Sequence, residues 1–220
     1  MKINFKIYFA IISMLLFRGI AFAQIPVEVF VGNKKATVDI MFFKYFKNKE
    51  GQNSKFLFFN RNRASIDCKM TETTNLPQFG FTEAFSYNAP KLKGFAPVVV
   101  ASILNRGIFP KAGIQFAKIK KNYTIFSWLV AETLKGPNID FFFLARYTPK
   151  LTEKLNLFSQ IELVNALPTV EQNNFTFTQR FRLGLKVKEF QFGAGLDLSQ
   201  LGRNNYTNTN NLGVFLRNEF

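Results

Sequence analysis

Residues 175–199 read FTFTQRFRLGLKVKEFQFGAGLDLS, and this stretch decides the fold. Between 175 and 187, mostly apolar side chains occupy every second position and alternate with Thr, Arg, Gly and Lys, and the alternation resumes after a two-residue turn. A period of two places successive side chains on opposite faces of a β-strand. The stretch therefore predicts a tight antiparallel hairpin with an apolar and a polar face. If the residues flanking the turn pair, Arg180 lies opposite Asp197 on the polar face.

The same alternation, more weakly, covers most of the chain, and clusters of Gly, Pro, Asn and Ser separate the runs. Twelve strands of about ten residues, the length that a tilted membrane strand needs, would leave short connections. Ten strands remain an alternative, and an even number is typical of bacterial membrane barrels. The predicted strands are 26–33, 35–46, 55–65, 78–88, 96–104, 111–120, 122–132, 138–148, 154–164, 175–187, 190–199 and 211–220.

The start of the chain predicts an export signal. Two lysines near the N-terminus precede an apolar run at residues 7–17, and Ala21-Phe22-Ala23 has the small-x-small pattern of a cleavage site. We therefore expect a signal peptide at 1–23, cut after Ala23, and a single barrel domain at 24–220. An uncleaved N-terminal anchor is the alternative.

Composition excludes several classes of function. The 220 residues include no His and a single Cys, so a histidine-based catalytic relay, an internal disulfide and a cysteine-built zinc site are all absent. We expect no catalytic residue, no metal and no cofactor. An acid pair such as Glu162 with Asp140 is the one enzymatic alternative, and paired lumen carboxylates are the simpler interpretation.

Alternation by itself fits a soluble barrel, with Phe inside, or a membrane barrel, with Phe toward lipid. The aromatic load favours the membrane, since 29 Phe, 6 Tyr and 1 Trp exceed what one small core packs. The expected connections also alternate between long (200–210, 165–174) and short (188–189, 149–153), as in barrels whose C-terminus lies on the inner side. We further expect aromatic girdles at the two membrane interfaces. Their candidate members are Tyr87, Tyr123, Trp128, Tyr147 and Phe220.

Residues 211–220 read NLGVFLRNEF and resemble the C-terminal assembly signal of Gram-negative outer-membrane β-barrel proteins. Gly213, the alternating apolar position Leu216 and the terminal aromatic Phe220 carry the resemblance. It implies that this segment is the closing strand and that the barrel-assembly machinery recognises it. The expected size and topology are also similar to those of small twelve-stranded nucleoside-channel and porin barrels, although no motif is shared.

The polar strand faces supply the expected lumen. Twelve strands lie between eight, which side chains fill, and sixteen, which enclose a water-filled pore. We expect a narrow diffusion channel with a basic lumen that passes small anionic or polar solutes. The alternative is that the same arginines pair with acids and close the lumen, which leaves a structural, anchoring or loop-display barrel. The candidate lumen bases are Arg61, Arg63, Arg146, Arg180, Arg182 and Lys186. The candidate lumen acids are Asp39, Asp140, Glu162 and Asp197.

The charge balance suggests partners. With 29 Lys and Arg against 14 Asp and Glu, the chain carries a formal charge of +15. Basic chains often bind nucleic acid, but the export signal and the apolar strand faces argue against that partner. We expect instead that basic side chains near the rims contact outer-membrane lipids, including the phosphates of lipopolysaccharide.

Overall fold

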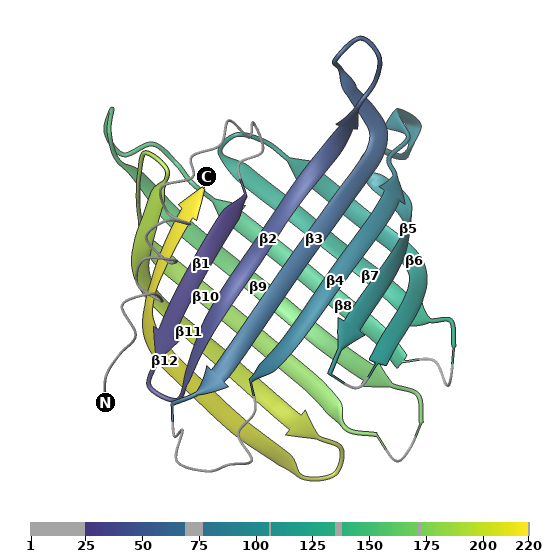
Figure 1. The fold of residues 1–220 in the computed structure, drawn as a ribbon, viewed down its shortest axis with the longest axis vertical. Coiled ribbons are helices and arrows are strands. Elements are labelled where there is room, and N and C mark those ends of the chain that lie inside the picture. Colours follow the sequence, from purple (N-terminus) through teal and green to yellow (C-terminus); the bar gives the residue numbers. More distant parts are fainter. Residues whose placement is uncertain (1–24, 69–76, 106, 135–137, 171–172, 220) are drawn as a thin grey trace, which may run out of the picture.

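The computed structural model describes residues 25–68, 77–105, 107–134, 138–170 and 173–219 and has a closed antiparallel barrel of twelve strands (Figure 1). Each strand pairs with its neighbours in sequence, and β1 pairs with β12 to close the barrel. Within these ranges no helix is both long and apolar enough to cross a membrane. The strands are β1 (Pro26–Gly32), β2 (Lys35–Lys47), β3 (Asn53–Asp67), β4 (Gln78–Tyr87), β5 (Phe95–Leu104), β6 (Gly107–Ile119), β7 (Tyr123–Glu132), β8 (Asn138–Tyr147), β9 (Asn156–Pro168), β10 (Phe175–Val187), β11 (Phe190–Gly202) and β12 (Tyr206–Glu219), and a short 3₁₀ helix, η1 (Pro90–Leu92), precedes β5.

The predicted strands are confirmed as to number and order, and β12 is the closing strand. The β10–β11 hairpin has the predicted register, with Arg180 opposite Asp197. The expected signal peptide (1–23) and Phe220 lie outside the described residues. We call the end of the barrel where β1 begins and β12 ends the terminal end, and the other the opposite end.

The expected contrast between long and short loops is wrong. The supposed long connection 200–210 shrinks to 203–205, because β11 and β12 stay paired from Ser199↔Thr209 to Gly202↔Tyr206. The supposed short connection at 149–153 instead runs from 148 to 155. Paired strands form backbone hydrogen bonds with each other whatever their side chains are. Asn and Thr residues that suggest a turn in the sequence therefore continue the strand pairing here.

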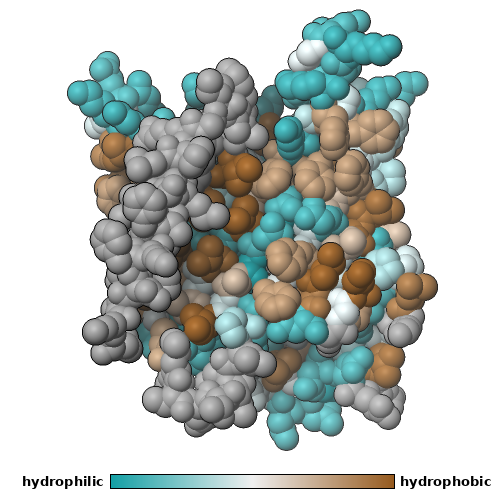
Figure 2. Space-filling model, in the orientation of Figure 1, coloured by the Kyte–Doolittle hydropathy of each residue, from teal (hydrophilic) through white to brown (hydrophobic). Residues whose placement is uncertain are grey.

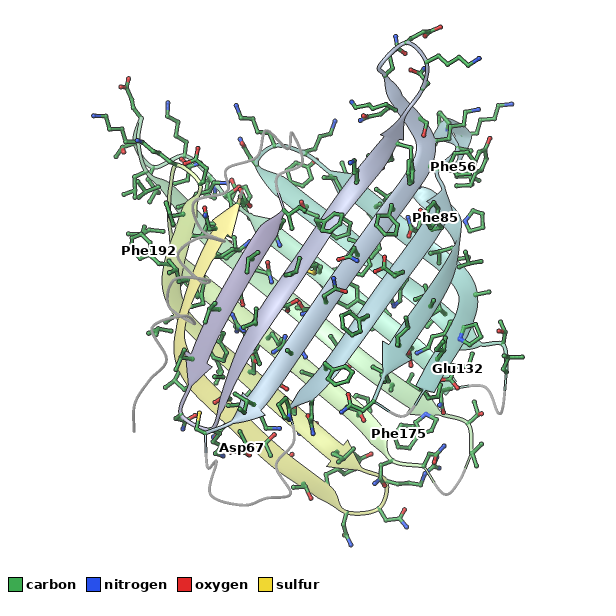
Figure 3. The ribbon with its side chains drawn as sticks, viewed as in Figure 1. Phe56, Asp67, Phe85, Glu132, Phe175 and Phe192 are labelled. Carbon is green, nitrogen blue, oxygen red and sulfur yellow. The ribbon has the colours of Figure 1, made fainter. Side chains whose placement is uncertain are left out.

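The outer face of the barrel is apolar around its middle. Exposed side chains there include Val99 at 60%, Leu183 at 60% and Val214 at 64%. Figure 2 shows hydrophobic surface between hydrophilic ends, and in Figure 3 Phe192 projects away from the barrel. An outward apolar band with polar rims is the pattern of a transmembrane barrel.

The inside of the barrel also contains aromatic side chains, which corrects the expectation that Phe faces lipid throughout. Phe59 and Phe126 stack with their ring centroids 5.3 Å apart, and Trp128 and Phe142 pack beside them. Trp128 is only 7% exposed, so it belongs to this cluster and not to a girdle. The middle of β7 is apolar on both faces, so its alternation does not reveal which side points inward, whereas Asp140 and Arg146 mark the inward face of β8. The buried inward aromatics are Phe30, Phe59, Phe126, Trp128, Phe142, Phe158 and Phe215, and the partly buried Phe43 and Tyr45 pack against them.

Candidate functional site

Six inward-facing charged side chains form a closed ring of ion pairs across the barrel. On the side of β2 and β3, Asp39 accepts hydrogen bonds from Arg61 (Nη2 to Oδ2, 2.5 Å) and Arg63 (Nη1 to Oδ2, 3.2 Å). The alternation of β3 aims both arginines inward, because they are two residues apart. In the order in which they touch, the members are Asp39, Arg61, Glu162, Arg180, Asp197 and Arg63.

The far side of the ring comes from β9, β10 and β11. Glu162, 1% exposed, accepts hydrogen bonds from Arg61 at 2.8 Å and from Arg180. Asp197 lies 3.2 Å from Arg63 and 3.8 Å from Arg180, and so closes the ring. Asp197 also accepts a 2.7 Å hydrogen bond from Arg182. Each acid therefore bridges at least two arginines, which limits the desolvation penalty of burying them.

Arg182 extends the ring toward β1. Its guanidinium donates to Glu28 (Nε to Oε1, 2.9 Å) and lies over the Phe30 ring, 4.0 Å from the centroid. Gly195 leaves the room for it, because a Cβ there would approach the Arg182 Cδ to 2.9 Å. Glu28 was missed in the sequence, although its position between Val27 and Val29 in an alternating strand indicates an inward side chain.

The remaining predicted lumen residues face inward but lie outside the ring. Asp140 pairs with Lys111 and not with a predicted arginine. Arg146 donates to Gln160 (Nε to Oε1, 2.9 Å), and Lys186 pairs with Glu219. Lys111 is a second residue that the sequence analysis missed. It lies four positions before Gln115 on β6, so both side chains point to the same face of the strand, and Gln115 is buried there.

The expected basic lumen is close to neutral. Apart from Lys35 and Asp67 at the opposite end, the inward-facing set has eight bases and seven acids, so its net charge is 8 − 7 = +1 among the described residues. The bases are Arg61, Arg63, Lys111, Arg146, Arg180, Arg182, Lys186 and Arg217. The acids are Glu28, Asp39, Glu132, Asp140, Glu162, Asp197 and Glu219.

Most of the basic excess lies instead on the outside of the terminal end, in what we call the lysine collar. Twelve exposed lysines and three exposed acids (Glu50, Glu153 and Glu189) lie there, which gives 12 − 3 = +9 among the described residues. Lys118 lies over the ring of Tyr123 at 5.8 Å, so the collar borders the expected aromatic girdle. The collar comprises Lys44, Lys47, Lys49, Lys55, Lys91, Lys93, Lys118, Lys120, Lys121, Lys150, Lys154 and Lys188.

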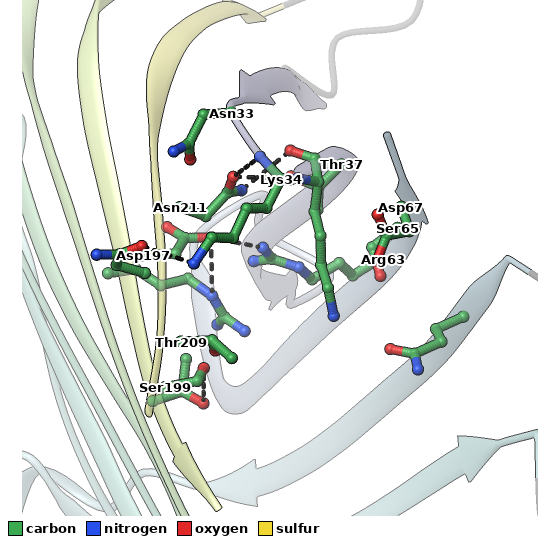
Figure 4. A pocket seen from close by; sticks show the side chains of 15 residues that line it. Asn33, Lys34, Thr37, Arg63, Ser65, Asp67, Asp197, Ser199, Thr209 and Asn211 are labelled. Atoms are coloured by element: carbon green, nitrogen blue, oxygen red, sulfur yellow. Dashed lines mark hydrogen bonds and ion pairs between the residues drawn. The ribbon is translucent and has the colours of Figure 1, made fainter. Parts of the chain in front are cut away.

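A cavity of about 530 Å³, which we call the vestibule, lies at the opposite end of the barrel (Figure 4). Its charged lining is positive, because four bases outnumber two acids. Hydroxyl and amide groups make up most of the rest, among them Thr37, Ser65, Thr178 and Asn211. The charged residues are Lys34, Lys35, Arg63, Asp67, Arg180 and Asp197.

Asn211 builds one wall of the vestibule by holding the β1–β2 turn. Its Oδ1 accepts from the backbone N–H groups of Lys34 (2.8 Å) and Lys35 (3.1 Å), and its Nδ2 donates to the Lys35 carbonyl (3.0 Å). Gly32 is required beside it, because a Cβ there would lie 2.2 Å from the Asn211 Oδ1. Lys34 Nζ in turn donates to Asn210 (2.9 Å), which keeps this ammonium at the rim.

A second cavity of about 280 Å³ extends from Leu104 and Thr176 at the opposite end to the aromatic cluster, and it shares Arg63 and Arg180 with the vestibule. Trp128, Phe142 and Lys111 line its other sides. The two arginines therefore stand between the vestibule and the second cavity. Phe59 precedes Arg61 on β3, which runs away from the terminal end, so the aromatic cluster lies on the terminal side of the ring.

The residues of the assembly signal that the structure describes take different positions in β12. Gly213 pairs with Gly32 on one side and Gly195 on the other, and a Cβ on it would meet the Val31 carbonyl oxygen at 2.0 Å. Leu216 faces outward and is 53% exposed. Gly213 therefore allows β12 to approach β1 closely, and Leu216 adds to the apolar outer face. Both features suit a closing strand.

The fold and its lining define a closed antiparallel barrel with an apolar outside and a charged inside, the build of a transmembrane barrel. Among the described residues, no group of three or more His, Cys, Asp or Glu could hold a metal ion. No family model and no curated protein matches the chain. Solved structures with a similar fold include a KdgM porin in complex with disordered oligogalacturonate, at 11% identity and a TM-score of 0.48, covering 89% of this chain and 98% of that one. A NanC porin is similar at 7% identity with the same coverage and TM-score.

Proposed function

We propose that this chain is an integral outer-membrane barrel that binds small anionic solutes in its vestibule and passes them through a narrow, low-conductance path. The observation that carries the proposal is the vestibule itself, a polar cavity that ends on Arg63 and Arg180. Guanidinium groups bind carboxylate and phosphate in bidentate fashion, and the surrounding hydroxyls and amides suit a polyhydroxylated solute. The path would continue past these two arginines into the second cavity.

A second candidate, a closed structural or anchoring barrel, is favoured by the interior. The ring of ion pairs spans the lumen, and the cluster around Phe59 fills the barrel on its terminal side. A small solute would pass only if these groups moved. The two candidates therefore differ in one measurable property, which is whether the folded barrel conducts ions.

Single-channel recording of the purified full chain in planar bilayers tests the channel. We expect small, anion-selective steps, and Arg63→Gln should reduce the preference for chloride over potassium. The stronger change Arg180→Glu should reduce it further, and Lys188→Glu, in the terminal turn outside the lumen, is the control that should leave it unchanged. Heat-modifiable gel migration checks that each variant is folded. A folded wild-type barrel without conductance refutes the channel and supports the closed barrel.

A variant of the aromatic cluster tests whether the interior limits the path. Phe59 is 1% exposed and contacts Phe126, Trp128 and Phe142, so Phe59→Ala should leave a cavity beside the ring. Conductance should rise if the cluster lies on the path. Phe192→Ala, which removes an exposed outward ring, is the matched control. Equal conductance of both variants and the wild type would place the path elsewhere.

We also propose the location and the remaining partners. Export would use the signal at 1–23, and assembly would use the C-terminal signal that ends at Phe220. If the terminal end faces the periplasm, the lysine collar would meet anionic headgroups of the inner leaflet. Contacts with lipopolysaccharide phosphates would then depend on the few cations at the opposite end, such as Lys34.

A further inference from the structure

A polar group interrupts the apolar outer face of the barrel at mid-height. Glu83 is the central outward residue of β4, with Phe79 and Phe81 on one side and Phe85 and Tyr87 on the other, all at least 40% exposed. In Figure 2 a hydrophilic patch lies within the hydrophobic surface near the middle of this face. On β3 the neighbouring outward positions are also polar. Asn60 lies directly opposite Glu83, and Asn62 follows it. We call Asn60, Asn62 and Glu83 the outer polar patch.

The hydrogen-bonding capacity of the patch is only partly used. Asn60 Nδ2 donates to Glu83 Oε1 at 2.5 Å. The side-chain oxygens of both Asn60 and Asn62 are buried and accept no hydrogen bond, and Asn60 as a whole is only 7% exposed. These residues belong neither to the ring of ion pairs nor to the vestibule, because their side chains point away from the lumen. The patch thus places an ionisable side chain and two unsatisfied amide oxygens, both covered by neighbouring side chains, at the level of the membrane interior.

Lipid cannot satisfy such groups. Acyl chains carry no hydrogen-bond donor, so an unpaired amide oxygen in that layer keeps its full desolvation cost. Ionisable side chains at membrane depth are rare, and they normally face another protein surface or a water-filled cavity. Asn and Glu side chains that meet across an interface between membrane segments act as adhesive contacts.

We propose that the outer polar patch is the centre of an interface with a second copy of this chain. A two-fold axis along the membrane normal brings each residue to the depth of its equivalent, so the patch must complement itself. It does so chemically, because each copy supplies the Asn62 side-chain amide as a donor and the Glu83 carboxyl group as an acceptor. The Asn62 side-chain oxygen accepts no hydrogen bond within the described residues, so the amide group would gain a partner by turning toward the other copy.

The surface beside the patch suits close packing. Phe58 lies between Phe42 and Phe85, with ring centroids at 6.1 and 5.2 Å, and Phe46 stacks on Phe85 at 5.4 Å. These four rings form a continuous aromatic surface on β2, β3 and β4, on the terminal side of the patch. A polar centre next to rigid aromatic rings combines specificity with contact area. The inference rests on the proposed membrane location but not on transport.

Cysteine cross-linking in lipid vesicles tests the interface. With the exposed Cys68 replaced by Ser, Asn62→Cys should give a disulfide-linked dimer band under mild oxidation. Gln179→Cys, an exposed outward position on β10 elsewhere on the barrel wall, is the matched control and should give little. Light scattering on the full chain in detergent should show the mass of a dimer. The triple change Asn60→Leu, Asn62→Leu and Glu83→Leu should reduce it to a monomer that stays folded by heat-modifiable migration.

The outcomes separate this inference from the proposed membrane location. Flotation of the vesicles and heat-modifiable migration report insertion, whatever the oligomeric state. An inserted chain that stays monomeric in detergent and cross-links no more at position 62 than at position 179 overturns the interface. Cross-linking of Asn62→Cys only to a different protein also overturns it, because the patch would then serve another partner.

Discussion

Glu162→Gln tests how dry the interior of the barrel is. The substitution removes the carboxylate that bridges Arg61 and Arg180, while Arg61 keeps Asp39 at 2.5 Å. Arg180 is left with Asp197 at 3.8 Å as its one remaining acid. Loss of one partner from a buried ion pair costs about 3–5 kcal/mol. Because Arg61 retains a partner, we expect the free energy of unfolding to fall by about 3 kcal/mol, measured by urea titration in lipid vesicles with gel migration as the readout.

The matched control is Glu162→Leu combined with Arg180→Leu, which removes both members of one pair. Replacing a buried pair by apolar residues is often close to neutral, so this variant should lose about 1 kcal/mol or less. A fall of under about 1 kcal/mol for Glu162→Gln alone would refute the reasoning, since pairs in water-like surroundings contribute about that little. Such a result would describe a water-filled lumen and would favour the open channel over the closed barrel.

Three further predictions concern the wall of the barrel. Gly195→Val should lower the free energy of unfolding by about 1–3 kcal/mol through overpacking against Arg182 and Phe30, whereas the outward neighbour change Ala194→Val should cost little in the same urea titration. Asn211→Ala removes three hydrogen bonds to the β1–β2 turn and should cost about 2 kcal/mol; a loss below about 0.5 kcal/mol would show that the turn holds its shape without them. The lysine collar should speed insertion into vesicles that contain anionic lipid, and raising the salt concentration should remove this advantage over neutral vesicles. Equal insertion rates in both lipids at low salt would contradict that role.

The strands could be predicted because their signal is local. Alternation in β10 and β11 fixed both the hairpin and its register, down to the pairing of Arg180 with Asp197. Loop lengths could not be predicted as well, because Asn and Thr at the ends of β11 and β12 suggest turns but continue a ladder that pairing maintains. Most lumen acids and bases were found for the same reason as the strands, because a charged residue in an alternating run marks the polar face. Glu28 and Lys111 were missed.

By itself the sequence determined the number and order of the strands, the hairpin register and most of the inward charges, because a period of two is a property of neighbouring residues. Only the tertiary structure decided what those charges do. The ring joins Asp39 to Glu162 and Asp197, residues more than a hundred positions apart, through arginines of β3 and β10. Tertiary structure likewise decided that Phe59 and Trp128 fill the barrel and that most exposed lysines lie at one rim. Where both faces of a strand are apolar, only closure of the barrel determines which side is inside.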